Sequence, residues 1–316
     1  MAEKDTVTKE YMQDKENFAD AFNFFLYDGE QIIKPEQLRP LDTTSVALPY
    51  GEDGRPVPIQ KYRDILKAAV AMEDGNAAYL LLGIENQSQI NYAMPVRNML
   101  YDALQYVGQV SETTSSHKRR LEKPETGGEF LSGFFKDDKL LPVITLTVYF
   151  GAESWDAPRS LHDMIKINDS RLLSYISDYK LNIIVPADIA DGDFQKFHTE
   201  LNLALKYIKY SNNKSELLRA VNEDAAYRSV NKKTVDMLNT LTNSKLSYSD
   251  REESVDMCKA IEEIRADGIA EGKAEGKAEG ILETLIGLFR DGLISLADAA
   301  VRAGMTETEF EQKARS

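Results

Sequence analysis

The chain has 316 residues and a formal net charge of −14, because 38 Lys and Arg stand against 52 Asp and Glu. The composition is that of an ordinary globular protein, but the acidic balance argues against a tight general DNA binder, since neutralising phosphates requires Lys and Arg. No apolar run approaches the ~18 residues that span a bilayer, the charged N-terminus lacks a secretory core, and the single Cys258 leaves no internal disulfide, so we expect a cytoplasmic protein without a membrane segment.

The N-terminal segment predicts a helix over residues 1–30. Apolar side chains such as Phe18 and Phe22 recur every three or four positions there, and Gly29 ends the pattern. The next 24 residues or so are rich in Pro and Gly, which is typical of a loop.

Two neighbouring segments come next and are joined by a turn signal. Residues 62–70 fit a strand or a short helix, and residues 77–85 predict a buried strand. Between them, the Asp-Gly pair at 74–75 is a hairpin signal. Residues 91–110 then predict an amphipathic helix.

The middle of the chain predicts a loop, two strands and then mainly helices. Residues 111–128 are polar and indicate a loop, whereas residues 140–150 and 182–186 indicate strands. Helices follow at 194–210, 213–221 and 229–239. This order predicts an α/β core over residues 1–190, a helical extension over 191–262 and a tail over 263–316.

The tail begins with glycines at every fourth position, Gly268, Gly272, Gly276 and Gly280. On a helix such glycines form a slowly turning stripe, which would let helices approach closely in a homo-oligomer. Four glycines also weaken a helix, so a mobile linker explains the repeat equally well.

Two short helices follow the repeat. Ser295 with Asp298, and Thr306 with Glu309, have the spacing of capping boxes, and Gly304 between them indicates a helix end. The pair looks like a helix-turn-helix, but acidic residues begin its second helix. We therefore prefer an interaction or dimerisation hairpin.

Asp64 and Glu85 are candidate ligands of Mg²⁺ or Mn²⁺. Each lies on one of the two segments joined by the 74–75 turn, and two carboxylates held at one sheet edge suit a hard cation. Gln87 lies two residues past Glu85, so on a strand it points to the same face and could position water or phosphate. Composition alone favours the alternative that both acids simply face solvent.

The chain resembles the Rpn family of recombination-promoting nucleases, also described as transposases of the PD-(D/E)XK nuclease superfamily. The resemblance rests on three ordered segments: KYRDILKAAV, AYLLLGIENQSQINYAMPVRNMLYDALQY, and LLPVITLTVYFG followed by WDAPRSLHDM. The opening helix and the Gly-Lys-Ala-Glu tail extend the likeness over most of the chain.

This resemblance implies a PD-(D/E)XK nuclease-like α/β core, a mixed sheet flanked by helices, with an α-helical C-terminal extension. It also implies a Mg²⁺- or Mn²⁺-dependent DNA endonuclease linked to recombination or mobile elements. Asp64 and Glu85 would be the metal ligands, and Gln87 would replace the family's catalytic Lys. Because a Gln carries no charge, it could orient a water or a phosphate but could not act as a general acid. The alternative function is a weak or inactive nuclease fold that binds DNA or regulates a partner as an oligomer.

Other side chains have a functional and a structural interpretation. Asp20 and Asn23 share a face of the first helix, where they would contribute near the metal or form a solvated polar surface. The basic cluster Lys118, Arg119 and Arg120, on the loop predicted at 111–128, would contact DNA phosphates or remain solvated. His162 has no ligand-spaced partner, which favours a structural role.

Overall fold

The computed structural model describes residues 2–41, 47–48, 57–58, 70–84, 92–167, 169–242, 244–249 and 253–315. They form two compact units, Met1–Met257 and Cys258–Ser316. The domain boundaries predicted at residues 190 and 262 stay predictions.

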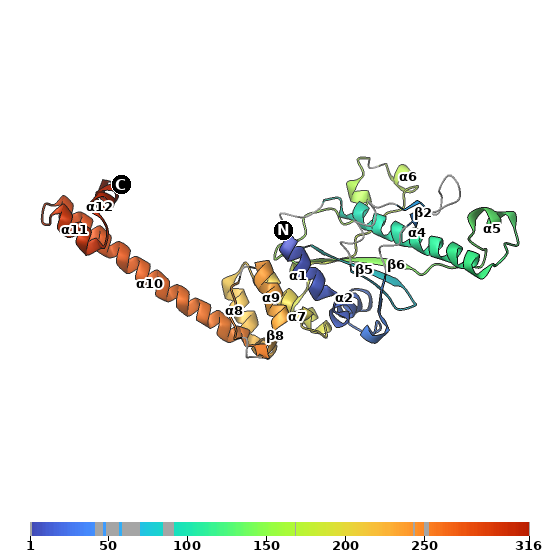
Figure 1. The fold of residues 1–316 in the computed structure, drawn as a ribbon, viewed down its shortest axis with the longest axis horizontal. Helices are drawn as coiled ribbons and strands as arrows, with labels where there is room; N and C mark the ends of the chain where they lie inside the picture. The colour runs from blue at the N-terminus through green and yellow to red at the C-terminus, as the bar shows by residue number, and fades with distance from the viewer. Residues whose placement is uncertain are drawn as a thin grey trace. The chain divides into compact units, whose positions relative to one another are not determined.

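The helices and strands of the first unit follow one another along the chain as shown in Figure 1. They are α1 (Ala2–Met12), α2 (Lys15–Tyr27), β1 (Arg39–Pro40), β2 (Ala47–Leu48), β3 (Val57–Pro58), β4 (Val70–Glu73), β5 (Ala78–Ile84), α4 (Met94–Arg120), α5 (Gly127–Ser132), β6 (Val143–Tyr149), α6 (Ser170–Leu173), β7 (Ile183–Ile184), α7 (Leu201–Tyr210), α8 (Lys214–Glu223), β8 (Val230–Asn231), α9 (Lys232–Thr242) and β9 (Ser254–Val255).

The N-terminal segment forms two helices rather than the single one predicted. Asp14 breaks it, because its side chain accepts a hydrogen bond from the Glu16 N–H at 2.9 Å and caps the start of α2. At the other end of α2, Asp28 and Gly29 adopt positive φ angles of 53° and 94°. Gly29 also packs against the Lys196 carbonyl, which a Cβ would approach to 2.7 Å, so glycine is required there.

A five-stranded mixed sheet forms the centre of the first unit, in the order β1-β4-β5-β6-β7. The β1, β4 and β5 strands pair antiparallel, whereas β5, β6 and β7 pair parallel. The strands predicted at 77–85, 140–150 and 182–186 are confirmed as β5, β6 and β7. Of the segment 62–70, only Val70 lies within the described residues, and it begins β4.

The hairpin signal at Asp74 is also confirmed. The Asp74 carboxylate accepts hydrogen bonds from the backbone N–H groups of Asn76 at 2.8 Å and Ala77 at 3.1 Å, which closes the turn between β4 and β5.

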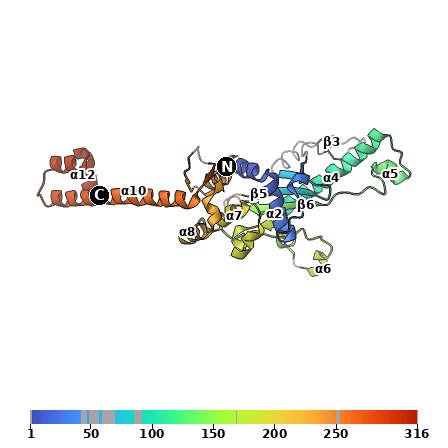
Figure 2. The ribbon, with the colours of Figure 1, turned by 90° about the horizontal axis from the view of Figure 1, so that it is seen from below.

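Helices cover both faces of the sheet (Figures 1 and 2). Leu80 of β5 shares a buried cluster with Tyr101 and Leu104 of α4. The next residue towards the N-terminus, Tyr79, points to the opposite face, where its ring lies 5.1 Å from that of Phe22 in α2. Because both faces of β5 are covered in this way, apolar residues follow one another along the strand without interruption.

The loop predicted at 111–128 is wrong in its first half. The α4 helix continues to Arg120, and Ser111 and Thr114 are buried on it. The chain after the helix packs against Thr114, since a Cβ at Gly133 would lie 3.3 Å from the Thr114 side chain. The sequence around them is polar, so apolar periodicity could not signal the extension.

The second unit contains the greater part of α10 (Met257–Arg290), then α11 (Leu296–Ala303) and α12 (Glu307–Arg315). Its core includes Leu285 and Phe310, and both predicted capping pairs are present: Ser295 accepts from the Asp298 N–H, and Thr306 exchanges hydrogen bonds with Glu309. The glycine repeat lies within α10 and is helical. Oligomerisation through this unit stays a prediction.

Candidate functional site

The start of β4 and the end of β5 lie at the same end of the sheet. Because β4 and β5 are antiparallel and Val70 pairs with Leu81, the chain enters β4 where it leaves β5. Asp64 precedes Val70 by six positions, and Glu85 directly follows Ile84, the last residue of β5. Asp64, Glu85 and Gln87 themselves lie outside the described residues, so their role as catalytic and metal-binding residues stays a prediction.

Helix α4 runs back over this sheet and makes a regular series of polar contacts with β6. Four residues of a helix advance about 6 Å and two residues of a strand about 6.6–6.8 Å, so positions four apart on α4 meet positions two apart on β6. The three contacts are Tyr106 with Val143, where the hydroxyl accepts from the backbone N–H at 3.0 Å, Asp102 with Thr145 at 2.5 Å, and Asn98 with Thr147 at 3.0 Å.

Asp102 is the acidic residue of this series. Its two carboxylate oxygens accept hydrogen bonds from the Thr145 hydroxyl at 2.5 Å and the Tyr179 hydroxyl at 2.7 Å. Burial raises the pKa of Asp102, and the two hydroxyl donors partly oppose that rise. Burial and the neighbouring carboxylate also raise the pKa of the Tyr179 hydroxyl, so Tyr179 remains a donor. This arrangement fixes α4 against the segment that leads into β7.

Two buried polar atoms near the carboxyl ends of β5 and β6 have no hydrogen-bond partner among the described residues. They are Oδ1 of Asn98, whose amide nitrogen donates to Thr147, and the hydroxyl of Tyr149, the last residue of β6. Burial, with the charges of Glu153 and Asp156, raises the pKa of Tyr149 to about 12. Buried polar atoms are normally paired, so both atoms are candidates to hold a water or a ligand.

A cavity of about 200 Å³ opens where β6 ends. Tyr149, Gly151 and Glu153 line one side, and Asn212 donates to the Glu153 carboxylate at 2.7 Å. A Cβ on Gly151 would lie 2.2 Å from the Tyr149 ring, so glycine lets the ring take this position. Ligands of open α/β sheets commonly bind beyond the carboxyl ends of parallel strands, which is where this cavity lies.

Asp20 and Asn23 are buried, which contradicts the interpretation of a solvated surface. The Asp20 carboxylate accepts from the N–H groups of His198 and Thr199 at 2.9 Å and from the Thr199 hydroxyl at 2.7 Å. Asn23 exchanges two hydrogen bonds with the backbone of Ile33, at 2.8 and 2.9 Å. Both side chains therefore already hold distant parts of the backbone in place.

The basic cluster Lys118, Arg119 and Arg120 occupies the last turn of α4 rather than a loop. Acidic side chains accompany it: Arg119 lies 2.5 Å from Glu112, and Arg120 lies 3.9 Å from Glu122. Lys118 is exposed and makes no ion pair among the described residues. A role in DNA binding stays a prediction. The acidic neighbours already balance part of the positive charge of this cluster.

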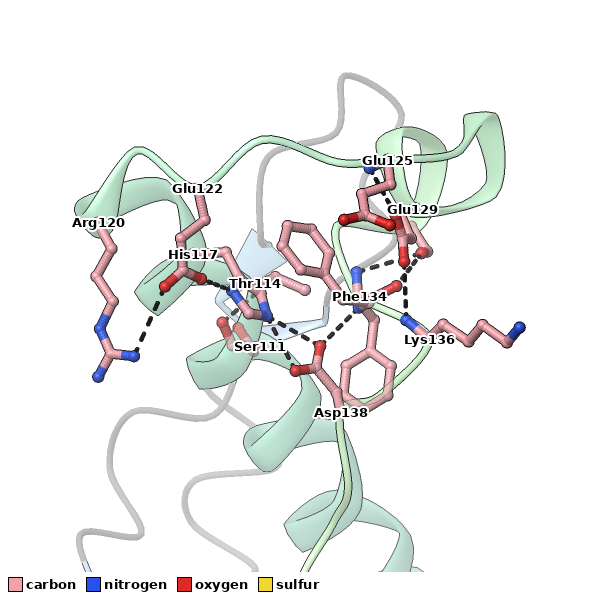
Figure 3. A network of polar contacts seen from close by, with 12 residues as sticks. Ser111, Thr114, His117, Arg120, Glu122, Glu125, Glu129, Phe134, Lys136 and Asp138 are labelled. Atoms are coloured by element: carbon pink, nitrogen blue, oxygen red, sulfur yellow. Dashed lines mark hydrogen bonds and ion pairs between the residues drawn. The ribbon is translucent and has the colours of Figure 1, made fainter.

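His117, next to this cluster, is the centre of a polar network (Figure 3). One ring nitrogen contacts the Glu122 carboxylate, the other contacts Asp138 at 2.9 Å, and the ring stacks on Phe135 with centroids 3.9 Å apart. Hydrogen bonds to Glu122 and Asp138 raise the pKa of His117.

His162 lies in a structural environment. Its Nε2 contacts the Ile176 carbonyl at 2.8 Å, and its backbone N–H donates to Asp178.

Within the described ranges, no group of three or more His, Cys, Asp or Glu side chains is arranged to hold a metal ion. Nor does any described helix combine the length and the apolar character needed to cross a membrane.

Sequence reasoning missed Asn98, Asp102 and Tyr149. A signal for the first two existed, since Asn98 and Asp102 are four apart on the helix predicted at 91–110 and so share a face. No sequence pattern marked Tyr149, because the burial of its hydroxyl without a partner depends on the tertiary structure.

A family model described as "Putative transposase, YhgA-like" matches residues 59–235, more than half of the chain. The match confirms the resemblance found in the sequence, to a family of PD-(D/E)XK-like nucleases. The mixed α/β sheet flanked by helices is confirmed, whereas the PD-(D/E)XK arrangement of that core stays a prediction. No curated protein and no solved structure matches the chain.

Proposed function

The chain belongs to the YhgA-like transposase family, and on that premise we propose that it is a DNA endonuclease, dependent on Mg²⁺ or Mn²⁺, that hydrolyses phosphodiester bonds in recombination or in the movement of mobile elements. The observation that carries the proposal is the antiparallel β4–β5 pair. In this pair the start of β4, which follows the segment that bears Asp64, lies at the same end of the sheet as the end of β5, which precedes Glu85.

The chemistry of these two side chains suits a divalent cation. Asp64 and Glu85 would supply carboxylate oxygens, and Mg²⁺ usually takes one or two carboxylates with the substrate phosphate and water completing its sphere. When bound, the metal would lower the pKa of a water and neutralise charge on the phosphate.

The chain's own polar groups would position the reactants. The Gln87 amide would orient a water or a phosphate oxygen, as the sequence suggests. Asn98 would offer its unpartnered Oδ1 as an acceptor for the water, while the contact of its amide nitrogen with Thr147 holds it in one orientation. The high pKa of Tyr149 keeps its hydroxyl protonated, so it would act as a donor and not as a base.

The test is nicking of supercoiled plasmid DNA with Mg²⁺ by the intact chain, by Asp64→Ala and by Glu85→Gln. We expect both substitutions to abolish nicking. Glu73→Gln is the matched control, because Glu73 ends β4 at the opposite end of the sheet, and this variant should nick as the wild type does. Equal activity of wild type and Asp64→Ala would refute the site. Absence of nicking in wild type with either metal would refute the nuclease and favour a non-enzymatic, DNA-binding or oligomeric regulatory role.

A further inference from the structure

Arg97 is a half-buried cation near the start of α4, at the carboxyl end of β5. Its neighbour Asn98 contacts Thr147 of β6, and Thr147 pairs with Leu82 of β5. The first turn of α4 is therefore level with the last residues of β5. The chain leaves this strand directly into Glu85, one of the two acids of the proposed metal site.

The face of α4 that carries Arg97 is turned towards β5. Tyr101 lies four residues further along the helix and so shares this face. It is completely buried, in the same cluster as Leu80 of β5. Four residues of a helix advance about as far as two residues of a strand, so one step towards the start of α4 brings Arg97 near the level of Leu82. This agrees with the contact made by Asn98.

Most of the donor groups of Arg97 are not used by the described part of the chain. Nε and Nη2 both donate to the hydroxyl oxygen of Tyr101, at 3.3 and 3.1 Å. A guanidinium has five N–H donors and no acceptor, so three N–H groups remain. Among the described residues these three have no acceptor, and no carboxylate lies within ion-pair distance of Arg97. The guanidinium is thus held in one place with donors to spare.

A structural role for Arg97 does not require its charge. A neutral side chain could donate to the Tyr101 hydroxyl equally well, and the dipole of α4 is positive at this end and disfavours a cation. Arg97 is also the only Lys or Arg in the sequence between Lys67 and Lys118. A single cation at the unfavourable end of a helix, with unused donors, indicates an anionic ligand.

The chemistry of the proposed site identifies this anion as a phosphate. Asp64, Glu85 and Gln87 would bring two negative charges to the site and no positive one. Hydrolysis of a phosphodiester increases the negative charge on the phosphate oxygens, and cationic side chains stabilise that charge. A guanidinium suits this task because two of its N–H groups match two phosphate oxygens.

We propose that Arg97 binds the DNA phosphate that is hydrolysed, through the N–H groups that Tyr101 does not use. The proposal rests on the proposed function, because it takes the ligand to be the substrate of that same site. Arg97 stays protonated throughout and takes no part in making or breaking bonds or in proton transfer. Tyr101 is the positioning residue, since its hydroxyl fixes the guanidinium.

The first test compares nicking of supercoiled plasmid DNA with Mg²⁺ by the wild-type chain, Arg97→Gln and Arg97→Lys. Gln can still donate to the Tyr101 hydroxyl but carries no charge, so a merely structural role would survive this substitution. We expect Arg97→Gln to slow nicking about 100-fold or more, as loss of one donor to a developing oxyanion does. Arg97→Lys keeps the charge without the planar fork and should fall between the two.

The second test measures binding without cleavage. With Ca²⁺ in place of Mg²⁺, the anisotropy of a fluorescent duplex gives the binding constant at several salt concentrations. Loss of one phosphate contact lowers the slope of log K against log salt by about 0.9, so Arg97→Gln should show this change and Arg97→Lys should not. Slower nicking by Arg97→Gln with an unchanged slope would overturn the direct contact.

Arg39→Gln is the matched control. Arg39 is exposed on β1, opposite Glu73, which ends β4 at the other end of the sheet. This variant loses the same charge and should nick and bind as the wild type does. Circular dichroism checks that the variants are folded. A measurement on the wild-type chain needs no substitution: the duplex should protect Arg97 from phenylglyoxal, read by peptide mass spectrometry. Equal modification of Arg97 with and without the duplex would overturn the inference.

The outcomes also separate this inference from the proposed function. If wild type nicks plasmid and Arg97→Gln nicks and binds as wild type does, the inference fails and the nuclease stands. If Arg97→Gln lowers the salt slope but wild type nicks no DNA with Mg²⁺ or Mn²⁺, the phosphate contact stands and the nuclease fails. A wild-type chain that neither binds nor nicks DNA refutes both.

Discussion

Replacing Asp20 by Ala should strongly destabilise the first unit, because Asp20 connects parts of the chain that are far apart in sequence. Its carboxylate accepts hydrogen bonds from the backbone N–H groups of His198 and Thr199, which lie 178 and 179 residues further along the chain, and from the Thr199 hydroxyl. The Thr199 oxygen in turn accepts from the N–H of Leu201, the first residue of α7. Asp20 is 1% exposed, so water cannot replace the lost acceptor.

The size of the effect follows from the groups left unpaired. Truncation leaves two N–H groups and one hydroxyl without an acceptor, and each unpaired buried donor costs about 1–3 kcal/mol. Because the hydroxyl of Thr199 can rotate towards another acceptor, we expect a total loss of about 3–5 kcal/mol in the free energy of unfolding. That is a large fraction of the roughly 5–15 kcal/mol that stabilises a typical domain.

Urea unfolding followed by circular dichroism in EDTA measures this loss. Asp28→Asn is the control, because Asp28 is the C-cap of the same helix, its left-handed conformation suits Asn, and the variant loses only an exposed ion pair with Lys196. Such a pair contributes about 0–1 kcal/mol. If Asp20→Ala unfolds at the wild-type urea midpoint in EDTA, the structural interpretation is refuted. If the variant also loses Mg²⁺ binding, Asp20 is instead a metal ligand.

Two further predictions concern ionisable groups. Glu122 and Asp138 raise the pKa of His117, so the protonated ring should stabilise the contact between the end of α4 and the turn after α5. This contribution should be fully present below the unfolded pKa of about 6.5 and should disappear as pH rises through the higher folded pKa. NMR titration of the ring checks this, and a midpoint at or below about 6.5 would contradict it. Tyr179→Phe removes a donor to Asp102, so the pKa of Asp102 should rise further, and the variant should lose about 1.5–3 kcal/mol at neutral pH and less in acid. Carboxyl NMR shifts and urea unfolding measure both effects, and an unchanged Asp102 pKa would show that the hydroxyl does not control it.

The sequence by itself determined the features that depend on a few neighbouring residues. The β-branched run of β6, the Asp-Gly turn after β4 and the capping pairs of α11 and α12 are each encoded within a short segment, and the structure confirms them. Periodicity and local hydrogen bonding need no distant partner, so they can be read directly. The ordered segments that resemble the nuclease family also predicted the family that the match over residues 59–235 confirms.

Only the tertiary structure decided what the isolated polar residues do. Asp20 finds its partners 178 residues away, Asn98 meets Thr147 across the helix–sheet interface, and His117 meets Asp138 beyond α5. No local pattern encodes such pairs, because a polar side chain on a helix looks the same in the sequence whether it faces water or a buried donor. Packing removes the water and thereby selects the partner, which is why burial of these side chains could not be predicted and their hydrogen bonds could not be assigned.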